Sequence, residues 1–223
     1  MLLLFDIDGT LLLRAADDHR EAIHAAIRRV YRVPEPEAAK VSTAGRTDPW
    51  IARSILLQLD VSAERIDDGM SEFKRVAAEE YRRRCRSDLT AHVSPGVVEL
   101  LDGLRDRGDV VLSLVTGNLE RIARIKLARA GLGMFFAGAQ GGFGSDHEDR
   151  AELPAIARAR AGTPERPYPR EETVVIGDTP LDIACARADG VRCVAVTTGQ
   201  YGRGELSEAD AVVSSARELA AVL

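Results

Sequence analysis

The feature that most constrains the fold is a series of short apolar runs separated by helical patterns. The runs are continuously apolar for the most part, and they lie at Leu2–Phe5, Val110–Val115, Thr173–Ile176, Arg192–Val196 and Ala211–Val213. Such strands are covered on both faces, as in parallel sheets. Helical patterns bounded by Gly, Pro, Asn or Ser lie between them, at residues 96–107, 119–130, 150–161, 180–188 and 214–222. This alternation predicts an α/β fold with a parallel, Rossmann-like sheet.

One segment breaks the alternation. Residues 14–91 carry helical periodicity but no convincing strand. We therefore expect an inserted α-helical cap at residues 14–91 and a Rossmann-like core made by residues 1–13 and 92–223. A weaker strand is expected at Phe135–Ala139, just before the glycine-rich residues 141–144.

Composition excludes several classes of protein. The 30 basic and 35 acidic residues give a net charge of −5, which offers no general attraction to nucleic acid or to an anionic membrane. No apolar run approaches the roughly 18 residues of a membrane span, and the first apolar residues follow no basic region. The three cysteines, Cys85, Cys185 and Cys193, form no even set and no zinc-type pair. We expect a cytoplasmic protein with no nucleic-acid partner, no membrane span and no signal peptide, and either a monomer or a homodimer.

Polar residues collect where three of the expected strands end. The first strand is followed by Asp6-Ile7-Asp8-Gly9-Thr10, the second by Thr116-Gly117-Asn118 and the Thr173–Ile176 strand by a segment that contains Asp178 and Asp182. Ligands bind beyond the carboxyl ends of the strands in open parallel sheets. Four carboxylates and a small hydroxyl group should therefore converge at one edge of the sheet.

Carboxylates at apolar strand ends need a cation, because buried like charges repel and lose hydration. Oxygen ligands without nearby Cys or His favour Mg²⁺. One carboxylate could instead accept a phosphoryl group as a nucleophile. Each segment taken alone could also be only a turn or a helix cap. Two such segments that both follow strands favour a site.

Two further features suit a phosphate. Thr116, Gly117 and Asn118 precede a helix, so the hydroxyl and backbone N–H groups could cradle an anion, although Asn118 alone could simply cap that helix. Lys126 interrupts the apolar stripe of the helical pattern at residues 119–130. Its amine needs an anionic partner or must extend along the apolar surface to water.

Together these motifs resemble those of the haloacid dehalogenase superfamily. The first motif of that family stands here as Leu4-Phe5-Asp6-Ile7-Asp8-Gly9-Thr10-Leu11, the second as Val115-Thr116-Gly117-Asn118 and the fourth as the segment from Val175 to Asp182. A helical cap after the first strand is typical of the phosphoglycolate phosphatase-like and β-phosphoglucomutase-like branch. The resemblance covers nearly the whole expected core in the right order.

The resemblance implies a role for each matching residue. Asp6 would attack phosphorus and carry an aspartyl phosphate, and Asp8 would protonate the leaving oxygen and then activate water. Mg²⁺ would be held by the Asp6 carboxylate, the Asp8 backbone carbonyl and Asp178, with Asp182 in the surrounding shell orienting waters or the lysine. Gly9, Thr116, Gly117 and Asn118 would contact the phosphorylated substrate.

The third motif of the family departs from its usual form. Relatives often carry Lys-Pro shortly before the strand of the fourth motif, whereas this chain has Asp149-Arg150-Ala151-Glu152. Either Arg150 supplies that charge, or Lys126 reaches the site from the preceding helix. We favour Lys126, because Lys40 and Lys74, the other two lysines, lie in the insert.

In the insert, Gly45-Arg46-Thr47-Asp48 resembles a Gly-x-Thr-Asp segment of related caps, in which a loop faces the active site. Arg46 is therefore our candidate for contacting the leaving group. A turn with Thr47 or Asp48 as the helix cap fits the same residues. His19 and His24 also lie in the insert and could contact substrate.

The leading interpretation is a Mg²⁺-dependent phosphatase for a small phosphorylated metabolite. A phosphomutase or a pyrophosphatase would use the same residues. A dehalogenase is disfavoured by Asp8, because displacement of halide needs no such acid. A non-enzymatic phospho-switch is disfavoured by the large helical insert and by the Asp-x-Asp-Gly-Thr spacing. The sequence motifs do not identify the substrate.

Overall fold

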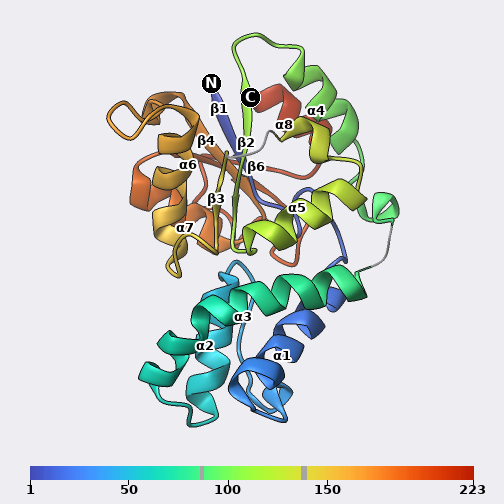
Figure 1. The fold of residues 1–223 in the computed structure, drawn as a ribbon. Helices are drawn as coiled ribbons and strands as arrows, with labels where there is room; N and C mark the ends of the chain where they lie inside the picture. The colour runs from blue at the N-terminus through green and yellow to red at the C-terminus, as the bar shows by residue number, and fades with distance from the viewer. Residues whose placement is uncertain (86–87, 137–139) are drawn as a thin grey trace.

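A computed structural model describes residues 1–85, 88–136 and 140–223 of the chain. The molecule has two lobes, one made of a parallel sheet with helices on both faces and the other made of helices alone (Figure 1). The helical lobe comes from the segment between the first and second strands. Both termini lie at the end of the sheet that points away from the helical lobe (Figure 1).

Six strands form the sheet, and eight α-helices are present in the described ranges. The strands are β1 (Leu2–Phe5), β2 (Val111–Thr116), β3 (Gly142–Phe143), β4 (Thr173–Gly177), β5 (Arg192–Val196) and β6 (Ala211–Val213). The helices are α1 (Asp17–Tyr31), α2 (Asp48–Gln58), α3 (Ala63–Arg84), α4 (Val97–Arg105), α5 (Glu120–Arg129), α6 (Leu153–Ala161), α7 (Pro180–Asp189) and α8 (Ala216–Val222). Short 3-10 helices occur at Pro36–Ala38, Thr90–His92, Gly133–Phe135, Arg150–Glu152 and Arg170–Glu172.

The sheet confirms the α/β class and the five main strands. The strand order is β3-β2-β1-β4-β5-β6, and every neighbouring pair is parallel. Strand β1 therefore lies in the middle, with Phe5 aligned with Leu114 of β2 on one side and with Ile176 of β4 on the other. This register brings the ends of three polar motifs to the same edge.

The weaker strand expected at Phe135–Ala139 needs a correction. Residues 137–139 lie outside the described residues, and Phe135 ends the 3-10 helix Gly133–Phe135. The edge strand is instead β3, within the glycine-rich segment. Its two residues pair with Val115 and Thr116, which places this short strand beside the end of β2.

Strand β1 has no polar residue because both of its faces are covered. Leu3 and Phe5 belong to a hydrophobic cluster that includes residues of α4, α5 and α8. Leu2 and Leu4 belong to a second cluster, which includes residues of α6 and α7. Alternate side chains of a strand point to opposite faces, so the continuous apolar run follows from this three-layer packing.

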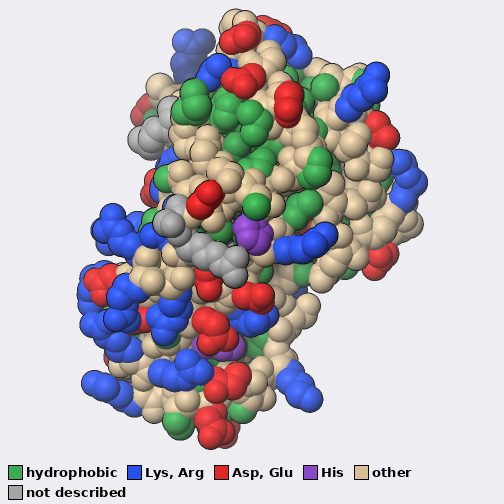
Figure 2. All heavy atoms as spheres, turned by 90° about the vertical axis from the view of Figure 1, so that its right-hand side faces the viewer, with side chains coloured by type: hydrophobic (Ala, Val, Ile, Leu, Met, Phe, Trp, Pro, Cys, Tyr) green, Lys and Arg blue, Asp and Glu red, His purple; other side chains and the backbone are tan. Residues whose placement is uncertain are grey.

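The helical lobe packs around its longest helix. Helices α1 and α3 lie along one another, with α2 beside them (Figure 1). Thr47 and Ser62 cap α2 and α3 by accepting hydrogen bonds from backbone N–H groups of the first turn. Figure 2 shows Lys, Arg, Asp and Glu side chains intermixed over this lobe. The division of the chain at residues 14–91 into a separate cap stays a prediction.

Among the described residues, no helix has both the length and the apolar character needed to cross a membrane.

Candidate active site

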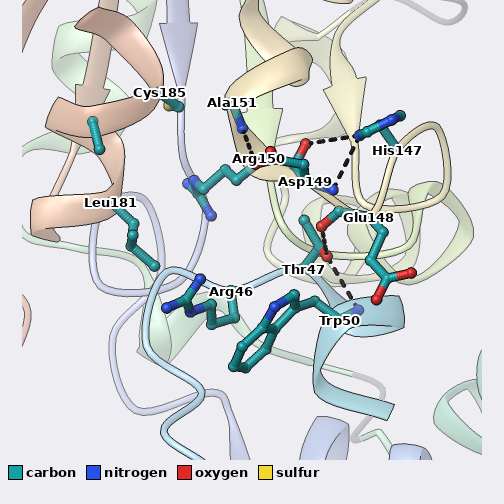
Figure 3. Close-up of a pocket in the computed structure, with 11 residues that line it drawn as sticks. Arg46, Thr47, Trp50, His147, Glu148, Asp149, Arg150, Ala151, Leu181 and Cys185 are labelled. Atoms are coloured by element: carbon teal, nitrogen blue, oxygen red, sulfur yellow. Dashed lines mark hydrogen bonds between the residues drawn. The ribbon is translucent and has the colours of Figure 1, made fainter. Parts of the chain in front are cut away.

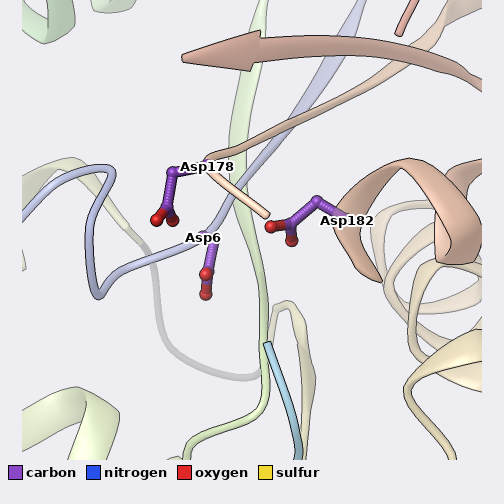
Figure 4. A group of neighbouring side chains, drawn as sticks. All are labelled: Asp6, Asp178 and Asp182. Carbon is purple, nitrogen blue, oxygen red and sulfur yellow. The ribbon is translucent and has the colours of Figure 1, made fainter. Parts of the chain in front are cut away.

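Three buried carboxylates meet at the carboxyl ends of the central strands. Asp6 follows β1, Asp178 follows β4 and Asp182 lies in the first turn of α7. One carboxylate oxygen of each lies within 4.8 Å of the others (Figure 4). The sequence brings them together because β1 and β4 are parallel neighbours and α7 begins immediately after β4.

The electrostatics of this cluster favour a bound cation. Burial raises the pKa of Asp178 to about 8, and the carboxylates of Asp6 and Asp182 add to the increase. Burial also raises the pKa of Asp6 to about 6, although Arg150 opposes the shift. A hard cation would offset both effects, and carboxylate oxygens are the ligands that Mg²⁺ prefers. The three carboxylates present therefore fit a hard cation such as Mg²⁺.

Because Gly9 has no side chain, there is room beside it for the carboxylate of Asp178. A Cβ atom at Gly9 would lie 2.2 Å from Asp178 Oδ2, and the φ angle of Gly9 is +87°, where side chains other than hydrogen are strained. Thr10 Oγ1 donates a hydrogen bond to Asp178 Oδ1 over 3.2 Å. The first motif therefore supplies Asp6 and also shapes the space in which Asp178 is held.

Arg150 bridges two of the three carboxylates. Its Nη2 atom donates a hydrogen bond to Asp182 Oδ1 and lies 3.3 Å from Asp6 Oδ2. Burial would lower the pKa of Arg150, but Asp182 and Asp6 more than offset this and raise it. The other oxygen of Asp182 accepts hydrogen bonds from the N–H and hydroxyl of Thr179. Asp182 thus contacts Arg150 and completes the capping box of α7 with Thr179. Its expected role in orienting waters or a lysine stays a prediction.

Asp8 lies in a different environment. Its Oδ2 atom accepts hydrogen bonds from Lys126 Nζ at 2.5 Å and from Asn118 Nδ2 at 2.9 Å. Burial would raise the pKa of Asp8, but Lys126 and His19 outweigh it and lower the pKa below its usual value. The second oxygen, Oδ1, is buried without a hydrogen-bond partner among the described residues. That oxygen is available to a ligand.

Lys126 does not reach water, since its exposed fraction is 0%. An ammonium group on an apolar stripe needs an anionic partner, and here that partner is Asp8. The Nζ atom of Lys126 also lies 3.1 Å from His19 Nδ1. Lys126 and Arg150 therefore both reach the site, and each pairs with different carboxylates. The sequence had left these two cations as alternatives for one position.

The second motif lies beside Asp8. Thr116 is buried at the end of β2, and its Oγ1 accepts a hydrogen bond from Asn118 Nδ2 at 2.9 Å. Asn118 does not cap α5, because the N-cap residue is Leu119. The Oδ1 atom of Asn118 is buried and, like Asp8 Oδ1, has no partner in the described residues. Gly117 allows a close approach by the helical lobe, since a Cβ there would lie 2.1 Å from the backbone oxygen of Arg46.

A cavity of about 800 Å³ separates the strand ends from the helical lobe. Asp6, Asp8, Asn118, Asp178 and Arg150 line one side, and Arg46 is among the residues on the other. A second cavity of about 440 Å³ shares Arg46 and Arg150 (Figure 3).

Arg46 lies at the boundary between these two cavities. Its guanidinium lies 4.1 Å from the centre of the Trp50 ring, and among the described residues it forms no ion pair. Thr47 caps α2, as the alternative interpretation of this segment held, while Arg46 remains free to contact a ligand.

Two functional contacts escaped the sequence analysis. His19 and His24, which could contact substrate, both line the larger cavity. His19 also lies between Lys126 and Asp48. Asp48 was considered only as a helix cap, yet its Oδ2 accepts a hydrogen bond from the N–H of Leu119 at 2.7 Å. The resemblance of this segment to Gly-x-Thr-Asp was the one sequence signal that Asp48 lies near the site. No local pattern indicated its contact with Leu119.

Comparisons with known proteins agree with this arrangement. A model of the haloacid dehalogenase-like hydrolase family matches residues 3–187. The phosphoglycolate phosphatase of Pseudomonas fluorescens is 28% identical over 217 residues, which cover 95% of this chain and 75% of the relative.

Two solved structures have the same fold. A predicted phosphatase from Clostridium acetobutylicum has a TM-score of 0.67 at 19% identity and covers 99% of this chain and 96% of its own. A predicted phosphoglycolate phosphatase from Haemophilus somnus has a TM-score of 0.67 at 20% identity, with the same coverage of 99% and 96%. At these identities the structural likeness establishes the fold alone.

Proposed function

The chain belongs to the haloacid dehalogenase-like hydrolase family, and from this premise we propose that it is a Mg²⁺-dependent phosphatase acting on a small phosphorylated metabolite. The observation that carries the proposal is that two aspartates close in sequence lie in different surroundings. Asp6 lies in the crowded carboxylate cluster beside Arg150, and Asp8, two residues later, lies against Lys126 with one oxygen unpartnered. A nucleophile and a proton-transfer group need such different surroundings.

In the first step, an oxygen of Asp6 attacks phosphorus and the bond from phosphorus to the ester oxygen breaks. Asp8 gives its proton to that oxygen as it leaves. Before substrate binds, Lys126 lowers the pKa of Asp8 and keeps it ionised. The negative phosphoryl group that arrives beside Asp8 raises this pKa, so that Asp8 takes up a proton from water and can pass it to the leaving oxygen. The phosphoryl group remains on Asp6.

In the second step, Asp8 takes a proton from water, which attacks phosphorus and breaks the bond from phosphorus to Asp6. Thr116 and the backbone N–H groups of Gly117 and Asn118 bind the phosphoryl oxygens. Arg150 orients Asp6 through both attacks. Mg²⁺, held by Asp6, Asp178 and the Asp8 backbone carbonyl, supplies positive charge that offsets the repulsion between carboxylate and phosphate. Arg46 contacts the leaving group from across the cavity.

The decisive experiment measures phosphate release from a panel of phosphate esters and pyrophosphate, with Mg²⁺ or with EDTA. We expect release to require Mg²⁺ and to fall at least about a thousandfold in Asp6→Asn, since loss of the nucleophile removes the covalent route. The ester with the highest kcat/KM identifies the substrate class. Preferred release from pyrophosphate would assign a pyrophosphatase instead.

A readout that does not depend on turnover accompanies this assay. Mg²⁺ at about 100 times its Kd should raise the free energy of unfolding by about 2.7 kcal/mol, and Asp178→Ala should remove that increase. Phosphate release that persists in Asp6→Asn would contradict the proposal. Mg²⁺-dependent stabilisation without release from any ester would point to a phosphomutase or a phospho-binding switch.

A further inference from the structure

The larger cavity extends from the carboxylates into the helical lobe, along α1 and α2. Both helices begin beside the sheet lobe and run away from it (Figure 1). The first turn of α1 marks the active-site end, because His19 contacts Lys126, which in turn contacts Asp8. The lining continues from there to Arg28 on α1 and to Ile55 on α2. An α-helix rises about 1.5 Å per residue, so the lining follows α1 for about 13 Å beyond His19.

One part of this extension is apolar. Its residues are Ile23 of α1, Ile51 and Ile55 on successive turns of α2, and Val41 from the segment that precedes α2. These branched aliphatic side chains form no hydrogen bonds, so a polar group placed against them would lose hydration without compensation. A methylene chain placed there is removed from water, which favours binding. The apolar part therefore fits the hydrocarbon portion of a leaving group.

A polar stripe of α1 also lines the extension. Arg20, His24 and Arg28 follow one another at intervals of four residues and therefore lie on one face of the helix. Two basic side chains, Arg20 and Arg28, act on His24, and two acidic ones, Glu21 and Glu37, balance them. Burial lowers the pKa of His24, so its imidazole is neutral at pH 7 and offers one donor and one acceptor. This region suits an uncharged hydrogen-bonding group.

We propose that the preferred substrate is a phosphate monoester with a long leaving group, which places a hydrocarbon chain against the isoleucines and an uncharged hydrogen-bonding group at His24. This inference rests on the proposed function, because it concerns the alcohol that the phosphatase releases. His24 lies five residues beyond His19, about 7.5 Å along the helix. An extended chain spans about 1.2 Å per bond, since three backbone bonds span about 3.6 Å, so six or seven bonds reach His24. A two-carbon leaving group ends well short of it.

The first test needs no variant. It measures kcat/KM with Mg²⁺ for ethyl, butyl and hexyl phosphate, whose alcohols are leaving groups of nearly equal reactivity. We expect kcat/KM to rise about fourfold for each added methylene group, because each one is buried against the isoleucines. Values that are independent of chain length, or highest for ethyl phosphate, would overturn the inference.

A second pair of esters tests the polar end. The compounds are 6-hydroxyhexyl phosphate and heptyl phosphate, which have the same number of heavy atoms. We expect kcat/KM to be about fivefold higher for the hydroxyl compound, since only its hydroxyl group can form a hydrogen bond with His24. Equal values for the two esters would be evidence against a hydrogen-bonding group at His24.

Variants then locate the contacts. Ile51→Ala should lower the ratio of kcat/KM for hexyl phosphate to that for ethyl phosphate about tenfold. Leu57→Ala is the matched control and should keep the wild-type ratio, because Leu57 lies on the same helix but is exposed, outside the lining of the cavity. His24→Leu should abolish the preference for the hydroxyl compound, whereas His24→Gln, which keeps a donor and an acceptor, should retain it. An unchanged ratio in Ile51→Ala would contradict the proposed contact.

Alkyl phosphonates separate this inference from the proposed function, because their bond between carbon and phosphorus leaves no ester oxygen to release. Their Kd values, measured by isothermal titration calorimetry with Mg²⁺, should fall about fourfold for each added methylene group. This fall in Kd without phosphate release from any ester would refute the phosphatase activity and leave the preference of the cavity standing. Phosphate release that requires Asp6 but is independent of chain length would refute only the long leaving group.

Discussion

At the scale of single residues, the two buried cations differ in what they stabilise. Arg150 lies between Asp6 and Asp182, whereas Lys126 lies against Asp8, which is the more exposed of these carboxylates. Removing Arg150 leaves a fully buried carboxylate without its cation, and such a loss typically costs about 3–5 kcal/mol. Removing Lys126 leaves Asp8 with Asn118 as a partner.

We therefore predict that Lys126→Ala lowers turnover at least about a hundredfold. Arg150→Ala should lower turnover and should also lower the free energy of unfolding by about 3 kcal/mol in the absence of Mg²⁺. Steady-state kinetics and urea unfolding check both values. A hundredfold loss in Arg150→Ala with none in Lys126→Ala would assign the catalytic cation to Arg150 alone.

At the scale of elements, a buried ion pair fastens α6 to the end of α7. Arg158 donates from Nε to Asp189 Oδ2 at 2.6 Å and from Nη2 to Oδ1 at 2.8 Å. Arg158 also donates to the backbone oxygen of Tyr168. Both members of the pair are buried, so the loss of one partner leaves the other without compensation.

Arg158→Leu should lower the free energy of unfolding by about 3 kcal/mol, because Asp189 would keep only the more distant Arg170. Arg105→Leu is the control, since it breaks an exposed pair with Asp102 and should cost less than about 1 kcal/mol. Urea unfolding measures both. Equal costs in the two variants would show that burial does not govern the strength of the Arg158 pair.

At the scale of the whole molecule, the two lobes touch through backbone at Gly117. Asp48 N donates to the backbone oxygen of Gly117 at 2.8 Å, and Arg150 donates to the backbone oxygen of Gly45 at 3.1 Å. Arg53 adds an ion pair with Glu148 at 2.7 Å. These contacts hold the helical lobe over the strand ends and enclose the cavity between them.

Gly117→Ala should disturb this closure, because its Cβ would lie 2.1 Å from the backbone oxygen of Arg46. We expect kcat/KM to fall at least about tenfold and the radius of gyration in solution to increase. Gly103→Ala is the control, since nothing lies within 4 Å of its Cβ and an added methyl in helix α4 should stabilise it by about 0.5–1 kcal/mol. An active, equally compact Gly117→Ala variant would be evidence against close contact between the lobes.

The sequence by itself determined the parallel α/β core, its main strands and the edge where the carboxylates gather. These follow from local patterns, since a strand buried on both faces must be apolar and a motif after a strand must lie at its carboxyl end. The family followed from the same residues, because Asp6, Asp8, Thr116 and Asp178 keep their order and spacing.

Only the tertiary structure decided which side chains pair. Lys126 and Asp8 are 118 residues apart, Lys126 and His19 are 107 apart, and Arg150 and Asp182 are 32 apart. No local pattern encodes such partners, because they depend on how the helices pack on the sheet and, for His19, on how the helical lobe docks on it. In the sequence, Lys126 and Arg150 were alternatives for one position. In the folded chain each pairs with its own carboxylates, because a buried charge must be compensated where it lies.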